Sequence, residues 1–75
     1  MKDQTSRIIS QVAKRFKELR KANGLSHARL AERAKVTRPA LSHIESGKRK
    51  PSLQMALKIA QALGVRLSDV LKDVE

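Results

Sequence analysis

Two short apolar segments, each preceded by a hydroxyl residue, follow one another with almost nothing between them. The first begins after Ser26 and the second after Thr37, and only Lys35 and Val36 separate the first segment from Thr37. Serine and threonine favour the N-cap position of a helix, because their side-chain oxygen accepts a hydrogen bond from a free N–H of the first turn. Two helices joined by so short a turn pack at a steep angle, and the second projects as a ridge.

Within both segments the apolar residues recur at helical spacing, which turns one face of each toward a core; they are Leu30, Ala31, Ala34, Leu41 and Ile44. The second helix is expected from about Arg38 to Ser46, with Gly47 as its stop. Pro39 is compatible with a first turn, because the N–H that proline lacks has no intrahelical partner there. Proline also disfavours the α region for the residue before it, so Arg38 is an alternative N-cap.

Three further helices are predicted around this pair. Their expected boundaries are about Ser6 to Ala22 with Thr5 or Ser6 as the cap and Gly24 as the stop, then Ser52 to Gly64, and finally a short helix after Ser68. Their apolar positions are Ile8, Ile9, Val12, Phe16 and Leu19, then Leu53, Ala56, Leu57, Ile59, Ala60 and Leu63, and last Val70, Leu71 and Val74. Because no stretch alternates in the manner of a strand, the predicted class is all-α. We expect one five-helix domain over residues 1–75, with the short-helix pair at about 26–46.

The charge of the chain narrows its possible partners. Lysine and arginine number 17 against 7 acidic residues, a formal net charge of +10 in 75 residues. Most of the excess lies between Lys14 and Lys50. Such a field attracts polyanions, namely DNA, RNA or an anionic membrane surface; the alternative is a solvated basic surface without a partner.

The residue types and segments that the sequence lacks exclude several kinds of site and several classes of protein. There is no cysteine, so disulfides, thiolate chemistry and zinc sites built on cysteine are excluded. No apolar run is long enough to span a bilayer, and the first ten residues lack the apolar core of a signal peptide, so a cytoplasmic protein is expected. No metal or cofactor is expected.

Residues Leu19–Val65, LRKANGLSHARLAERAKVTRPALSHIESGKRKPSLQMALKIAQALGV, resemble the Cro/cI-type, or XRE-like, helix-turn-helix transcription regulators. The resemblance rests on the spacing of the apolar positions together with the ESGKRKPS loop. It implies a lambda-repressor-like domain that binds double-stranded DNA. The resemblance further implies binding as a homodimer to a pseudo-palindromic operator. The recognition helix, here residues 38–46, would lie in the major groove.

The resemblance also implies roles for individual residues. The base-reading positions are Arg38, Pro39 and His43, with Ala40 and Ser42 alongside them. An arginine there suits guanine, because its planar fork matches O6 and N7. Phosphate contacts are implied for Ser26, His27, Arg29, Ser46, Lys48, Arg49 and Lys50. Ser26, His27 and Arg29 lie at the start of a predicted helix, where free backbone N–H groups attract anions.

Arg20 and Glu45 match the positions of a structural ion pair of the family. The chain departs from the family pattern at Lys35, where glycine is common because the residue takes a positive φ, and at Arg29, where a glutamate usually completes the capping box. For a dimer interface we expect Leu67, Val70, Leu71 and Val74; alternatively, Leu67, Val70 and Leu71 close the core of the monomer.

Other functions are less well supported by the sequence. The two histidines, His27 and His43, lack the further groups that a catalytic site needs, so an enzyme is not expected. RNA readers and membrane-surface helices generally use exposed aromatic side chains, whereas Phe16 is the one aromatic residue and lies on an inward stripe. Among DNA-binding roles, a repressor or activator, a restriction–modification controller and an antitoxin with a toxin partner remain open.

Overall fold

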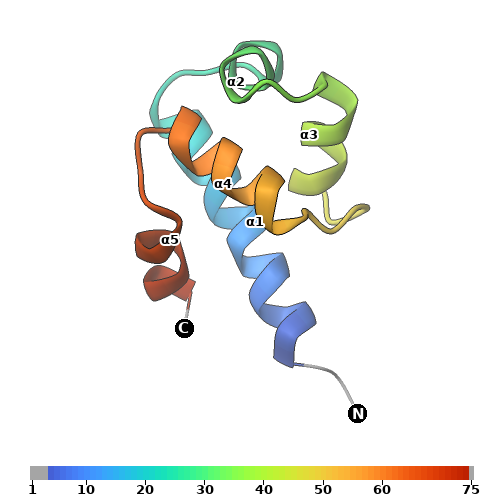
Figure 1. The fold of residues 1–75 in the computed structure, drawn as a ribbon, viewed down its shortest axis with the longest axis vertical. Helices are drawn as coiled ribbons and strands as arrows, with labels where there is room; N and C mark the ends of the chain where they lie inside the picture. Colours follow the sequence, from blue (N-terminus) through green and yellow to red (C-terminus); the bar gives the residue numbers. More distant parts are fainter. Residues whose placement is uncertain (1–3, 75) are drawn as a thin grey trace.

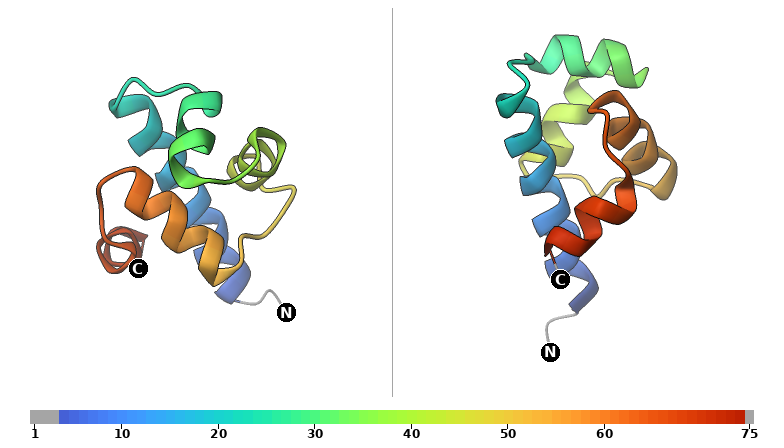
Figure 2. Two further views of the ribbon diagram at one scale, coloured as in Figure 1. Left: turned by 45° about the horizontal axis from the view of Figure 1, so that its top comes forward. Right: turned by 90° about the vertical axis from the view of Figure 1, so that its left-hand side faces the viewer.

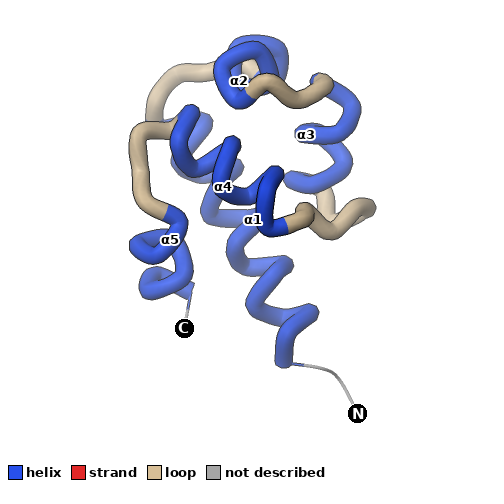
Figure 3. The backbone as a smooth tube through the Cα atoms, in the orientation of Figure 1, coloured by secondary structure: helices blue, strands red, loops and turns tan. Residues whose placement is uncertain are grey.

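The computed structural model describes residues 4–74, and within that range it contains five α-helices and no strand (Figures 1 and 3). The helices are α1 (Gln4–Ala22), α2 (His27–Ala34), α3 (Arg38–Glu45), α4 (Leu53–Ala62) and α5 (Leu67–Val74). The all-α class and the five-helix layout predicted from the sequence are therefore confirmed. None of these helices is long and apolar enough to cross a membrane.

Three helices begin at the hydroxyl caps that the sequence indicated. The hydroxyl oxygens of Ser26, Thr37 and Ser52 each accept a hydrogen bond from the backbone N–H three residues later, at 3.1, 3.2 and 3.1 Å. Thr37 has extended backbone angles, as an N-cap residue does, so the alternative that Arg38 caps α3 is wrong. Ser26 keeps its half of the capping box even though Arg29 replaces the usual glutamate.

The ends of four helices differ slightly from the prediction, and one of them is α4, which ends at Ala62, two residues before Gly64. α1 already includes Gln4 and Thr5, so neither Thr5 nor Ser6 is its N-cap; the Ser6 hydroxyl instead accepts a hydrogen bond from Lys50 Nζ at 3.4 Å. α3 ends at Glu45, and Ser46 is its C-cap. α5 begins before Ser68, because Asp69 N–H and Val70 N–H both bond to the carbonyl of Arg66.

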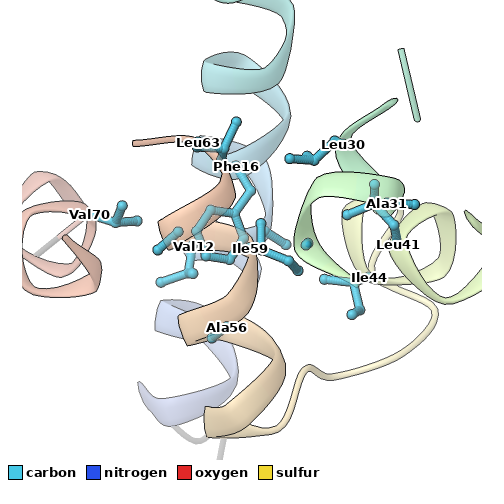
Figure 4. Packing of buried hydrophobic residues seen from close by; sticks show 13 residues of the cluster. Val12, Phe16, Leu30, Ala31, Leu41, Ile44, Ala56, Ile59, Leu63 and Val70 are labelled. Carbon is cyan, nitrogen blue, oxygen red and sulfur yellow. The ribbon is translucent and has the colours of Figure 1, made fainter. Parts of the chain in front are cut away.

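The core lies where the α2–α3 pair and α5 meet the crossing of α1 and α4. Phe16 of α1 and Ile59 of α4 lie at its centre, with Leu30 and Ile44 of α2 and α3 on one side and Val70 of α5 on the other (Figure 4). All five side chains are fully buried. In Figure 1 and in the left view of Figure 2, α4 lies between α5 and α3. The helix pair is thus held at one end of the molecule, with its outer face clear.

The predicted apolar face of α4 is too broad. Leu53 is 70% exposed and Leu57 is 43% exposed, whereas Ala56, Ile59 and Leu63 are buried. Leu53 is the first residue of the helix, and the spacing of apolar residues alone does not reveal how far the neighbouring helices cover it. Two leucines are therefore left on the surface.

Lys35 ends α2 in the left-handed conformation, with φ 57° and ψ 43°. Its backbone N–H bonds to the carbonyls of Ala31 and Glu32, which closes the helix and directs the chain toward Thr37. A positive φ is strained for a residue with a side chain, by roughly 1 kcal/mol. The strain expected at Lys35 from the family pattern is therefore present.

We predict that Lys35→Gly raises the free energy of unfolding by about 0.5–1 kcal/mol, because glycine adopts this conformation without strain. Urea denaturation followed by circular dichroism measures the change. Lys35→Ala is the matched control: it removes the charge but keeps a Cβ atom, and no gain is expected. Equal gains for both variants would show that charge rather than backbone strain is responsible.

Candidate nucleic-acid interface

The turn between α2 and α3 fixes how the second helix is presented. Val36 N–H bonds to the carbonyl of Ala31 at 3.0 Å, so the chain turns within two residues before Thr37 begins α3. Leu41 and Ile44 are fully buried and anchor the inner face of α3. The outer face is left for other contacts, and it lies on the periphery of the molecule (Figures 1 and 2).

A buried charged cluster joins three helices behind this face. The Arg20 guanidinium of α1 donates from Nε to Glu45 Oε2 at 2.9 Å and from Nη2 to Glu45 Oε1 at 3.1 Å. Arg20 Nη1 also donates to the carbonyl of Leu25 at 2.8 Å. The side chains of Arg20 and Glu45 are only 9% and 3% exposed. The ion pair that the family resemblance implied is therefore present, and it ties α1 to the end of α3.

His27 belongs to the same cluster, which sequence reasoning did not anticipate. Its Nε2 lies 3.0 Å from Glu45 Oε1, so the carboxylate is bound from α1 and from α2. The imidazole is 32% exposed and lies at the first residue of α2. The contact joins residues 18 positions apart, and no local pattern in the sequence signals it.

The predicted base-reading residues divide into two groups. Arg38, Pro39 and His43 are exposed, and Ser42 is half-buried. Arg38 forms none of the ion pairs found among the described residues, so its guanidinium is available. Ala40 is only 7% exposed, because it lies on the inward side of the first turn. The expectation that Ala40 contributes a readout surface is therefore not supported by its position.

The basic loop after α3 is tied to the helix through one carbonyl group. The carbonyl of His43 accepts hydrogen bonds from Lys48 N–H at 2.9 Å and from Arg49 N–H at 3.1 Å. The Ser46 hydroxyl donates to the same carbonyl at 3.1 Å. Gly47 makes this return possible with a φ of 81°, a conformation that glycine adopts freely. The side chains of residues 48–50 are exposed beside the C-terminal end of α3.

The electrostatics of this face favour an anion. Neither α2 nor α3 has an acidic residue in its first turn, so no carboxylate there neutralises the positive ends of the two helices. Arg29 is exposed on the first turn of α2. The one acidic residue of α3, Glu45, is turned inward onto Arg20. Among the described residues, no group of histidine, aspartate and glutamate side chains is placed to hold a metal ion.

The residues expected at a dimer interface also divide. Val70 is 1% exposed and packs in the core of the monomer, so it has no surface for a partner, and for this residue the prediction is wrong. Leu71 is 37% exposed, and Leu67 and Val74 are half-buried. Leu67 and Leu71 line an apolar groove together with Ile8, Ile9 and Leu53. The exposed Leu53 at its rim was not identified as a surface residue from the sequence.

Comparison with known proteins places this geometry among regulators. A helix-turn-helix family model matches residues 16–70. An uncharacterised HTH-type transcriptional regulator of Bacillus subtilis, YgzD, is 43% identical over 56 residues, which are 75% of this chain and 85% of that protein. The immunity repressor of Bacillus phage phi105 is 37% identical over 60 residues, 80% of this chain and 42% of the repressor. The crystal structure of the restriction–modification controller protein C.AhdI from Aeromonas hydrophila matches with a TM-score of 0.77 and 33% identity, over 84% of this chain and 94% of that one.

We predict that Glu45→Ala lowers the free energy of unfolding by about 3–5 kcal/mol, because it leaves the buried Arg20 without its partner. The matched control is Asp73→Ala, which removes the partner of Arg15 from an ion pair whose side chains are 36% and 52% exposed. Exposed pairs contribute under about 1 kcal/mol. Thermal and urea denaturation of both variants measures the difference. A loss of unfolding free energy in Glu45→Ala as small as that in Asp73→Ala would contradict a structural role for the Glu45 cluster.

Proposed function

The chain belongs to the Cro/cI-type, XRE-like family of helix-turn-helix transcription regulators, and on this premise we propose that it reads a specific double-stranded DNA site as a homodimer. This family consists of regulators and not of enzymes. The observation that carries the proposal is the outer face of α3. It combines an unpaired arginine, an exposed histidine and a basic loop, and the acidic residue of the helix is turned away.

In this proposal α3 enters the major groove, which is about 12 Å wide and admits one helix. Arg38 begins the helix and meets the O6 and N7 atoms of a guanine with its two-pronged guanidinium. Pro39 offers an apolar surface to a thymine methyl group. His43 lies about one and a half turns further along, where its ring nitrogens can donate to or accept from a base edge.

Two groups of residues hold the DNA backbone on either side. At one end, the first turn of α2 presents backbone N–H groups together with Ser26, His27 and Arg29. At the other end are the exposed side chains of residues 48–50, with Ser46 beside them. The backbone N–H groups of Lys48 and Arg49 are bonded to α3 through the carbonyl of His43. Contacts of this kind set the register of the protein on the duplex but carry no sequence information.

The homodimer is proposed to form through the face of α5 and the apolar groove. This face contains an apolar hollow lined by Leu67, Leu71, Ile8 and the exposed Leu53. A two-fold contact brings the same patch of both subunits together, so an exposed apolar patch is buried when it meets its copy. Two recognition helices would then lie about 34 Å apart, on half-sites roughly ten base pairs apart.

The structure gives no support for RNA or a membrane as the ligand, and it supports the alternative regulatory roles unequally. Phe16 is fully buried, so the described part of the chain exposes no aromatic ring on which RNA bases stack or with which a helix enters a membrane. The likeness to C.AhdI favours a controller protein of a restriction–modification system as the second candidate role. An antitoxin with a toxin partner has no specific observation in its favour.

Two substitutions separate base reading from phosphate binding. We predict that Arg38→Ala costs about 1–3 kcal/mol on a selected operator and relaxes the preference at one base position per half-site. Lys50→Ala is predicted to weaken operator and scrambled duplex together and to reduce the salt dependence of log K by about one unit for each phosphate interaction it removes. Binding titrations of each variant with the operator and the scrambled duplex, at two salt concentrations, measure the affinities and their salt dependence. Equal weakening of both duplexes by Arg38→Ala would make Arg38 a phosphate contact and contradict the proposed orientation of α3.

The dimer is tested by sedimentation. We predict that the chain sediments as a dimer at high concentration and that Leu71→Glu shifts it to the monomer, because a charge then lies in the apolar groove. Leu57→Glu is the matched control, since Leu57 is similarly exposed on α4 but does not line the groove. Monomeric behaviour of the unaltered chain, with and without operator DNA, would reject the dimer.

A further inference from the structure

The imidazole of His27 lies between a buried carboxylate and the proposed phosphate-binding end of α2. One ring nitrogen, Nε2, is engaged by Glu45 Oε1 at 3.0 Å. The ring is 32% exposed, while the Glu45 side chain is 3% exposed, so the ring reaches from the interior to the surface. Its other nitrogen, Nδ1, has no partner among the hydrogen bonds of the described residues.

The carboxylate decides which ring nitrogen carries a proton. Glu45 accepts three hydrogen bonds from Arg20, two of them at Oε1, the same oxygen that His27 contacts. An ionised carboxylate only accepts hydrogen bonds, so His27 Nε2 must be the donor. In the neutral ring Nδ1 then has no proton and is an acceptor, like a phosphate oxygen. Only in the imidazolium form does Nδ1 become a donor.

One charged group contacts the ring, and the other charged or titratable groups to be considered lie on the same three helices. Glu45 from α3 touches it, and Arg20 from α1 binds the same carboxylate oxygen. Arg29 lies on the first turn of α2, and the exposed face of α3 carries Arg38 and His43. Within this set Glu45 is the single acidic group, and it is already engaged by Arg20. A phosphate beside the ring would therefore add the second negative charge that favours the imidazolium form.

We propose that His27 is a proton-linked phosphate contact, so that binding of duplex DNA takes up a proton on this ring in each subunit. The inference rests on the proposed function, because it requires DNA at the N-terminal end of α2. In the protonated state Nε2 donates to Glu45 and Nδ1 donates to a phosphate oxygen, so the ring connects the DNA backbone to the cluster that holds α3. Affinity for DNA then rises as the solution becomes more acidic, because the protonated ring is the form that donates to the phosphate.

The proton uptake can be measured directly on the unaltered chain. Calorimetric titration of a selected operator at one pH near neutrality, in buffers with different ionisation enthalpies, gives the number of protons taken up per subunit. We expect net uptake, together with an affinity that increases by about fivefold or more between pH 8 and pH 6. Specific binding with no proton uptake would overturn the inference and leave the proposed function intact. Absence of specific binding at every pH would reject the proposed function itself.

Two variants assign the proton to its residue, since His27 and His43 are the only histidines of the chain. His27→Gln keeps a donor for Glu45 but does not titrate, so most of the pH dependence of affinity should disappear. His43→Gln should retain the pH dependence, whatever its effect on affinity. Thermal denaturation of both variants at pH 6 and pH 8 verifies that they are folded during the binding measurements. Full pH dependence in His27→Gln, or its loss only in His43→Gln, would contradict the assignment to His27.

Discussion

The contact between Arg20 and Glu45 is the interaction on which the arrangement of the binding face depends. Leu41 and Ile44 bury one side of α3, but apolar packing does not specify orientation as strictly as directed hydrogen bonds do. The guanidinium reaches Glu45 with two nitrogens and the carbonyl of Leu25 with a third. It therefore fixes the end of α3 to α1 and to the turn before α2. Desolvation of the two charges is costly unless every partner is in place, so the cluster favours one relative placement of three helices.

The same contact determines the charge of the outer surface. Because Glu45 is directed inward, the exposed side of α3 has basic and neutral side chains only. The positive N-terminal ends of α2 and α3 and the loop of residues 48–50 add to this field. One residue thus supplies structural order and keeps negative charge away from the face that we propose meets DNA. His27 extends the cluster to the surface, so the proposed protonation of its ring would act at the same face.

Features encoded within a few residues could be predicted from the sequence. The caps Ser26, Thr37 and Ser52 follow from local backbone chemistry, and the structure confirms them. The positive φ of Lys35 is expected from the family pattern alone, because local backbone chemistry disfavours it at a lysine. Features that depend on contacts between residues far apart in the sequence could not be predicted in this way. Helical spacing assigns a residue to a face but does not show how far the neighbouring helices extend. The exposure of Leu53 was therefore missed, and the sequence left open whether Val70 lies in the core or at an interface. The contact of His27 with Glu45 likewise depends on how the steep α2–α3 packing brings the two helices together.

The structure of the chain bound to a selected operator tests the central claim most directly, because it shows the recognition helix and its supporting cluster together. The account predicts α3 in the major groove, the Arg38 guanidinium within hydrogen-bonding distance of a guanine edge, and Glu45 still bound by Arg20. A complex in which another face of the molecule enters the groove would contradict it. So would a complex in which Glu45 leaves Arg20, because the cluster would then not be what positions the helix.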